Sequence, residues 1–268
     1  MIGDDANDLL VLSKQYQRLK SFPLFSYPEK RIPKHLKTDF EAAAFITLVN
    51  QDYLLVAGSA SKKIRERFLI IPVINHELDL SQNQMINVGV FINRLKDRGV
   101  AEVNLEGMTL VNNQLLLSNR GNQSNPVNQI IVTQPDFWKN QGDSDFKLME
   151  CDYSQYTDGI LSVSELCYEL STDTLLITFS SEATSNAYED GEIGNSYLGY
   201  VRNARQKIEQ SVLHLNGMIN LAEQNEAFAG EKIEGICVEE VNDEELILHM
   251  VSDNDLGASR LFKCSLIL

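Results

Sequence analysis

The sequence has little positive charge for its size. Its 268 residues carry 23 Lys and Arg against 38 Asp and Glu, which gives a formal net charge of −15. Such a surface repels the phosphates of nucleic acids and of anionic lipids, so we expect neither nucleic acid nor membrane partners. The acidity suits cations or a cationic ligand, but it also serves solubility, and composition alone favours the second explanation.

Cysteine and long apolar runs are also scarce. The four cysteines, at positions 151, 167, 237 and 264, form no CxxC pair and have no His at ligand spacing. This excludes a zinc site of the usual kind, and the four scattered His make other transition metals poor candidates. No apolar run approaches the ~18 residues of a membrane span. The opening MIGDD has neither a charged leader nor an apolar signal segment, which predicts a cytoplasmic protein, although a start that had been cut short would also lack a signal peptide.

What the sequence does have is a pattern that occurs four times. Each copy begins with a Glu, continues with a β-type run, a polar turn and a second β-type run, and a third β-type run follows after a polar loop. The copies are residues 39–61, 104–122, 162–184 and 232–255, and the third runs are 67–73, 129–133, 196–201 and 260–268. Three-stranded antiparallel meanders that recur in this way predict an all-β fold built of propeller blades.

Residues 1–17 match the end of one such copy without its first strand. We therefore expect a β-propeller of five blades in a single domain, with the N-terminal blade incomplete. The predicted units are residues 1–27 (partial), 38–100, 101–158, 159–229 and 230–268. Residues 86–99 predict a short amphipathic helix that ends at Gly99, and residues 211–230 predict either an outer strand or a second short helix at the rim.

Propeller geometry predicts where the acidic residues lie. The start of each first strand and the loop after each second strand should border the same mouth of the central channel. The repeated glutamates, Glu41, Glu106, Glu165 and Glu234, would then share that mouth. The predicted ligand-binding residues are Asp4, Asp5, Glu41, Arg65, Glu106, Asn119, Arg120, Glu165, Glu182, Asp190, Glu192 and Glu234.

Carboxylates that face one cavity repel each other, so they either bind protons with a raised pKa or hold a cation. Hard oxygen ligands favour Ca²⁺ or Mg²⁺, with Glu41, Glu106, Glu165 and Glu234 as the metal ligands. The competing explanation is structural: these glutamates accept hydrogen bonds from backbone N–H groups or Arg and lock neighbouring blades. A third explanation is chance recurrence.

Two other classes of site are excluded by motif. The segment DGEIGNS at 190–196 lacks the strand-to-helix context of GxGxxG and has no GK[ST], so we expect no nucleotide cofactor, and we expect no haem. No Ser lies in a GxSxG context, which argues against serine hydrolysis.

The segments DFEAAAF…GSASKKIRERF, NLEG…LLLSNRG and SELCY…SSEAT…DGEIGNSYLG resemble an uncharacterised family of bacterial domain-of-unknown-function proteins with a predicted propeller-like fold. The resemblance covers nearly the whole chain and implies a fold without an activity. Phytase-like and lactonase-like propellers, which use calcium at the channel mouth, are similar only at the level of the fold.

Three functions follow as alternatives. The first is a protein that binds a small molecule or divalent cation at the acidic mouth. The second is a divalent-cation-dependent hydrolase of a phosphoester or lactone, in which the metal would activate water and Glu182 would be the general base. The third is a scaffold whose rim binds a protein partner.

Overall fold

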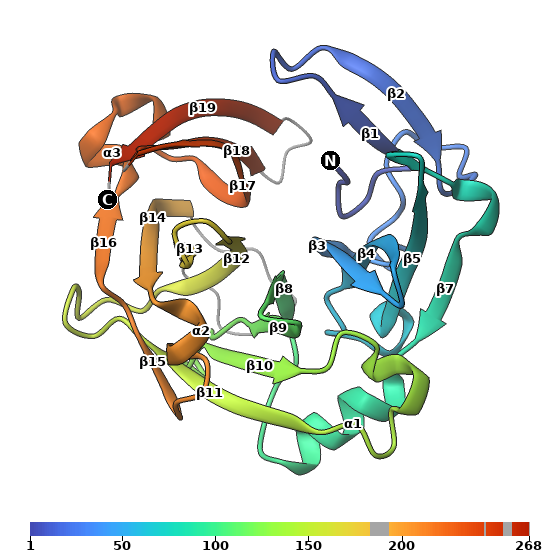
Figure 1. Ribbon diagram of the computed structural model, residues 1–268, viewed down its shortest axis with the longest axis horizontal. Helices are drawn as coiled ribbons and strands as arrows, with labels where there is room; N and C mark the ends of the chain where they lie inside the picture. The colour runs from blue at the N-terminus through green and yellow to red at the C-terminus, as the bar shows by residue number, and fades with distance from the viewer. Residues whose placement is uncertain (183–192, 244, 254–258, 268) are drawn as a thin grey trace. The chain divides into compact units, whose positions relative to one another are not determined.

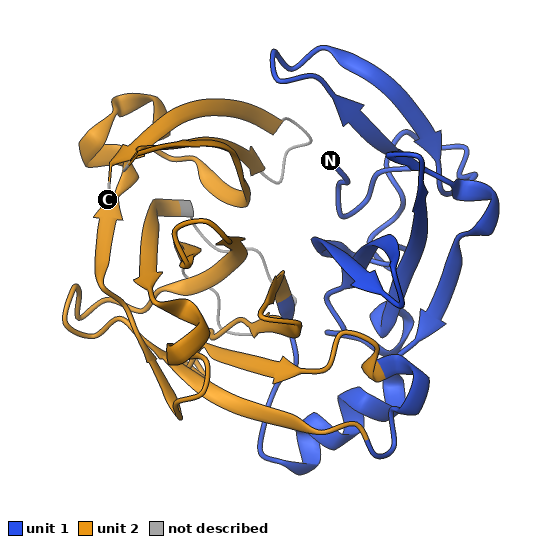
Figure 2. Cartoon of the chain, in the orientation of Figure 1, with its two compact units in different colours: residues 1–105, 138–143 blue, residues 106–137, 144–268 orange. Residues whose placement is uncertain are grey.

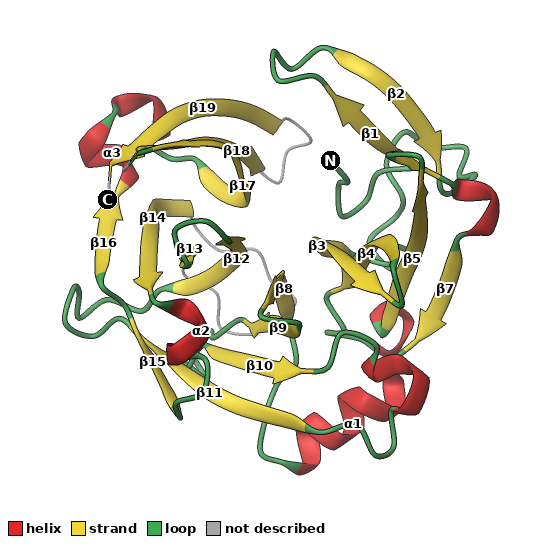
Figure 3. Cartoon of the chain, in the orientation of Figure 1, coloured by secondary structure: helices red, strands yellow, loops and turns green. Residues whose placement is uncertain are grey.

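The computed structural model describes residues 1–182, 193–243, 245–253 and 259–267, without the side chains of residues 182 and 193. The chain forms two compact units: unit 1 is residues 1–105 with 138–143, and unit 2 is residues 106–137 with 144–268 (Figure 2). Strands make up most of both units, and the described helices are few and short (Figure 3). No helix within the described ranges has the length and apolarity needed to cross a bilayer. The all-β prediction is confirmed.

Unit 1 contains one sheet and one hairpin. The sheet has the order β3-β4-β5-β6, and β7 also pairs with β5 (Figure 1). The hairpin β1–β2 forms a separate two-stranded sheet, and its Leu9 packs with Phe40, Val56 and Ile71 of the larger sheet. The element bounds are β1 (Asp8–Leu12), β2 (Arg18–Pro23), β3 (Phe40–Leu48), β4 (Gln51–Gly58), η1 (Lys63–Arg65), β5 (Arg67–Ile74), β6 (Glu77–Leu78), η2 (Leu80–Gln82), β7 (Gln84–Asn87) and α1 (Gly89–Asp97), and η3 (Phe137–Asn140) overlaps the 138–143 segment.

Unit 2 contains three sheets. Their orders are β15-β11-β10-β9-β8, β12-β13-β14-β16 and β17-β18-β19. The element bounds are β8 (Leu105–Val111), β9 (Gln114–Asn119), β10 (Gln129–Thr133), β11 (Phe146–Asp152), β12 (Ser162–Glu169), β13 (Thr174–Glu182), β14 (Ile193–Arg202), α2 (Ala204–Lys207), β15 (Val212–His214), β16 (Gly217–Asn220), α3 (Leu221–Gln224), η4 (Glu226–Phe228), β17 (Lys232–Asn242), β18 (Glu245–Asp253) and β19 (Ser259–Ile267).

The three sheets of unit 2 pack face to face in chain order. β12 contacts both β9 of the preceding sheet and β17 of the following one (Figure 1). One apolar cluster, which includes Leu116 and Ile177, fills the first interface, and a second, which includes Leu176 and Leu248, fills the other. Both faces of the middle sheet are therefore buried, as in the blades of a propeller.

The four predicted full repeats are confirmed as four blade-like sheets, each a meander of at least three antiparallel strands. The turns explain part of this accuracy. Asn112 and Asn113 join β8 to β9 with φ angles of 48° and 60°, the left-handed pair that a two-residue hairpin turn requires. The count of five blades is not confirmed: residues 1–27, predicted as an incomplete blade, contain the separate two-stranded hairpin β1–β2.

The predicted rim elements are present in part as helices and in part as strands. α1 buries Phe91, Ile92 and Leu95, and it stops before Gly99, whose φ is 98°. Residues 211–230 contain both predicted kinds of element. β15 extends the preceding sheet by pairing parallel to β11, and β16 extends the next sheet by pairing with β14.

Candidate functional site

The start of each first strand lies beside the end of the second strand of the same sheet. In β3–β4 the pairing ends at Phe40 and Gly58, and in β17–β18 it ends at Lys232 and Asp253. The antiparallel register requires this, because the second strand runs back along the first. Within each sheet, the polar residues that open the first strand are therefore neighbours of the loop that follows the second.

Three first strands carry a β-bulge close to their start. The extra residue is Glu41 in β3, Ser164 in β12 and Glu234 in β17. A bulge turns the side chain of its extra residue out of the regular alternation. The third repeat therefore differs by one residue from the sequence alignment: Ser164, and not Glu165, takes the position of Glu41 and Glu234.

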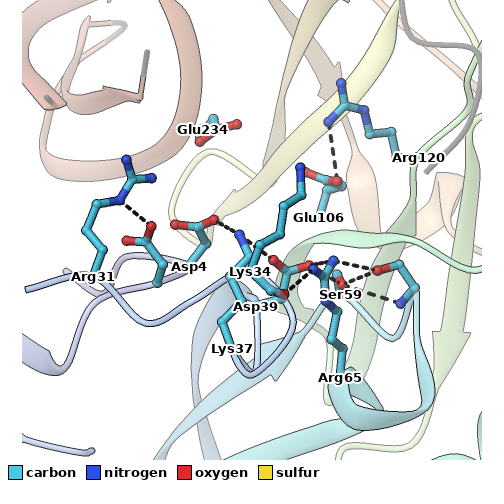
Figure 4. A network of polar contacts seen from close by, with 12 residues as sticks. Asp4, Arg31, Lys34, Lys37, Asp39, Ser59, Arg65, Glu106, Arg120 and Glu234 are labelled. Carbon is cyan, nitrogen blue, oxygen red and sulfur yellow. Dashed lines mark hydrogen bonds and ion pairs between the residues drawn. The ribbon is translucent and has the colours of Figure 1, made fainter. Parts of the chain in front are cut away.

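In unit 1, Asp39 is the centre of a buried polar network (Figure 4). Its Oδ2 accepts hydrogen bonds from Arg65 Nη1 at 2.5 Å and from Ser59 Oγ at 2.6 Å, and its Oδ1 pairs with Lys37 Nζ at 2.7 Å. A buried carboxylate is stable only with such partners. Asp39 and Lys37 were not among the predicted site residues, although Asp39 opens the segment DFEAAAF on which the family resemblance rests.

Three carboxylates of unit 1 lie close enough for a metal ion. One oxygen each of Asp4, Asp39 and Glu41 lie within 4.8 Å of one another, a spacing compatible with calcium. The ammonium of Lys37, however, pairs with both Asp4 and Asp39. Burial alone would lower the pKa of Lys37, but the charges of Asp39 and Asp4 outweigh it and raise that pKa. Lys37 thus stays protonated and serves as a tethered cation, which a metal ion would have to displace.

Two more predicted residues of unit 1 hold neighbouring segments together. Asp5 pairs with Arg31. Arg65, only 3% exposed, donates from Nη1 to Ser61 Oγ at 3.0 Å and from Nη2 to the backbone carbonyl of Lys34 at 3.2 Å. These contacts tie the segment before β3 to the turn before β5.

In unit 2, Glu165 joins two sheets. Its Oε1 accepts the backbone N–H of Met108 in β8 at 3.0 Å and of its own neighbour Leu166 at 2.9 Å. Burial raises the pKa of Glu165 well above its usual value; the two backbone bonds oppose this and the charge of Glu106 adds to it. The geometry of Glu165 is that of the blade-locking alternative.

Gly107 explains how the two sheets come so close at this point. A Cβ at this position would lie 2.7 Å from the backbone nitrogen of Leu166, 2.8 Å from Cα of Glu165 and 2.8 Å from Oγ of Ser118. Only glycine permits such an approach. The Glu-Gly pair at 106–107 is therefore a packing requirement as well as part of the repeat.

Glu234 differs from Glu165 because it is partly open to solvent. Its side chain is 24% exposed, and its Oε1 pairs with Nζ of Lys232 at 2.7 Å. Burial raises the pKa of Glu234 to about 7; Lys232 opposes the shift, and the charges of Glu106 and Asp253 add to it. Glu234 therefore exchanges its proton close to neutral pH. Lys232 is a further site residue that was not predicted.

Glu106 is electrostatically coupled to both Glu165 and Glu234. Its charge raises the pKa of both Glu165 and Glu234, so the three glutamates of unit 2 lie within electrostatic range of one another. Oε1 of Glu106 lies 3.4 Å from Nη1 of Arg120 (Figure 4), and the residue before Arg120, Asn119, is buried. We call Glu106, Glu165 and Glu234 the glutamate cluster. That Glu41 shares a mouth with this cluster stays a prediction.

A buried hydroxyl without a partner lies next to the cluster. Ser118 is fully buried in β9, its Oγ lies 2.8 Å from the place that a Cβ on Gly107 would take, and this oxygen has no hydrogen-bond partner among the described residues. Buried polar atoms are nearly always paired in native proteins. This feature could not be predicted from the sequence, because Ser118 resembles any polar residue at the end of a strand.

The remaining predicted residues cannot be placed. Asp190 and Glu192 lie outside the described residues, and Glu182 ends β13 with an undescribed side chain. The general-base role of Glu182 stays a prediction.

The comparisons with known proteins agree with the resemblance found in the sequence. No curated protein matches the chain. A family model described as a family of unknown function, DUF6929, matches residues 1–266, and the repeated blade-like sheets fit the propeller-like fold that the resemblance implied. The chain therefore belongs to the DUF6929 family of unknown function.

Proposed function

We propose that this protein is a binding protein for a small cation and that the glutamate cluster of unit 2 is its site. The observation that carries the proposal is Glu234. This carboxyl group is partly exposed, touches a lysine, and still has a pKa of about 7 because burial and neighbouring acids outweigh that lysine. A carboxyl group in this state gains by exchanging its proton for a cation that also faces Glu106.

The network in unit 1 supports a binding role less well. Lys37 already bridges two of its three close carboxylates, and Arg65 neutralises Asp39 on the other side. A cation that enters there competes with two basic side chains for one carboxylate, whereas at Glu234 it competes with Lys232 and with a proton. We therefore place the binding site in unit 2 and assign the Asp39 network to holding segments of unit 1 together.

The test is a thermal-shift titration with Ca²⁺, Mg²⁺ and organic ammonium salts at pH 6 and pH 8. Protons compete for Glu234 at the lower pH, so a ligand of this site should raise Tm more at pH 8. Glu234→Gln and Glu106→Gln should abolish the pH-dependent part. The control is Glu240→Gln, which changes an exposed glutamate of the same strand. The proposal fails if no cation raises Tm beyond sodium chloride of equal ionic strength at either pH.

A further inference from the structure

The last sheet of unit 2 ends in a long strand, β19, whose outer edge carries no further strand. In the other sheets the third strand has an antiparallel neighbour on its outer side: β7 beside β5, β11 beside β10 and β16 beside β14. β19 is the third strand of its sheet, and among the described elements only β18 pairs with it (Figure 1). An edge of this kind presents backbone N–H and C=O groups to which another strand can bind.

The other outermost strands have features that prevent pairing with a second chain. β7, β15 and β16 span only 4, 3 and 4 residues. β2 has an extra residue, Leu19, in its pairing with β1, and it ends in Pro23. β19, by contrast, pairs with β18 over nine residues without a bulge, and it contains no proline. Because short strands, bulges and prolines are the usual means of blocking a sheet edge, β19 lacks three of the protections that the other edges have.

Charge does not block this edge either. The two basic residues of β19 are Arg260 and Lys263, and each already pairs with an acid of the same unit. Nη1 of Arg260 lies 2.5 Å from Oε1 of Glu231, and Nζ of Lys263 lies 2.6 Å from Oε2 of Glu239. Basic residues at an edge repel an incoming basic strand, but a neighbouring acid offsets most of that repulsion. A strand that itself carries a paired lysine can therefore approach.

We propose that β19 pairs antiparallel with β19 of a second copy of this chain, which joins two three-stranded sheets into one of six strands. The symmetric register centred on Cys264 uses residues 261–267. Opposite residues in this register are matched in polarity: Leu261 with Ile267, Phe262 with Leu266, and Lys263 with Ser265.

This match is the reason that a second copy fits the edge. Ile267, which is 75% exposed in the single chain, meets an apolar residue, and Lys263 does not meet another charge. Both copies use the same strand, as the two-fold symmetry of most protein dimers requires. The inference goes beyond the proposed function, because β19 contributes no residue to the glutamate cluster.

The experiment is sedimentation-velocity ultracentrifugation of the full chain from micromolar to submillimolar concentration. We expect a reversible equilibrium between monomer and dimer. Ser265→Glu places an acid opposite Lys263 of the second copy, twice by symmetry, and should tighten the dimer about three- to tenfold, whereas Ser265→Lys should weaken it by about the same factor. Ser265 is exposed, so neither substitution disturbs the packing of the single chain.

The net charge of the protein predicts the opposite order of effects. Two chains of charge −15 repel each other, so at an unrelated surface an added Lys favours association and an added Glu opposes it. Gln84→Lys and Gln84→Glu, on the exposed strand β7, measure that general effect and are the matched controls.

Two results would overturn the inference. The first is a chain that stays monomeric up to its solubility limit, in which case the edge of β19 would be left to a strand of another protein. The second is a dimer whose affinity changes at Ser265 in the same order as at Gln84, because this would place the contact elsewhere. The measurement on the unaltered chain stands even if a variant does not fold.

Discussion

Glu234 should make the stability of this protein fall as the pH rises from 5 to 8. Its pKa is raised from 4.5 to about 7, chiefly by burial. Between these values the native state holds a proton that the unfolded chain has lost, so unfolding releases a proton and a higher pH favours it. At about 1.4 kcal/mol per unit of pKa, Glu234 contributes a loss of about 3 kcal/mol once the pH has passed 7.

The assay is urea unfolding of wild type and Glu234→Gln at pH 5, 6, 7 and 8. Glutamine cannot titrate. Between pH 5 and pH 8 the free energy of unfolding of the variant should therefore fall by about 3 kcal/mol less than that of the wild type. Glu165, whose pKa is also raised by burial, contributes a decline of the same sign in both proteins. The informative quantity is therefore the difference between the two pH profiles.

Absolute stability is a poor readout here, because Glu234→Gln also removes one ion-pair partner of the buried Lys232. The m-values should agree between the two proteins, which would show that both unfold with the same change in exposed surface. Parallel pH profiles for wild type and Glu234→Gln would refute the reasoning. Glu240→Gln, on the exposed side of β17, should follow the wild type throughout.

Three further predictions concern stability and need only urea or thermal unfolding. Asp39→Asn should lower the free energy of unfolding by about 3–5 kcal/mol, because it leaves two buried cations without their shared carboxylate; a loss below 1 kcal/mol would show that the network is not structural. Gly107→Ala should lower the free energy of unfolding by about 1–3 kcal/mol, because the added Cβ overlaps the backbone of the next sheet. Gly142→Ala is the control and should leave stability unchanged, since a Cβ there meets nothing within 4 Å. Equal effects at the two sites would contradict the packing argument. Val49→Asn should stabilise the chain by about 1 kcal/mol, because Val49 has a φ of 49° in an exposed hairpin turn and β-branched residues are strained there; an unchanged or lower midpoint would be the contrary result.

Much of the fold could be predicted from local sequence signals. Alternating apolar residues, as in β18, where every second residue is buried, specify strands. Paired asparagines at 112–113 specify a tight turn, and Gly99 specifies the end of α1. These signals work because they depend on neighbours in the chain.

The candidate site was predicted only in part. The glutamates could be found because they recur, but the recurrence did not reveal that a bulge falls on Ser164 and turns Glu165 into a contact between sheets. Asp39, Lys37 and Lys232 were missed because none of them repeats at a fixed spacing. Their importance comes from which charges they meet after folding.

The sequence by itself determined the strands, their order and the end of each sheet at which the acids lie, because hydrophobic period, turn residues and antiparallel register are local properties. The tertiary structure alone decided which acids are charged. Lys37 pairs with two acids of one cluster, while burial raises the pKa of Glu165 and Glu234 in the other. The physical reason is that the pKa of a carboxyl group depends on solvent and on the charges within a few ångströms, and those neighbours come from distant parts of the chain.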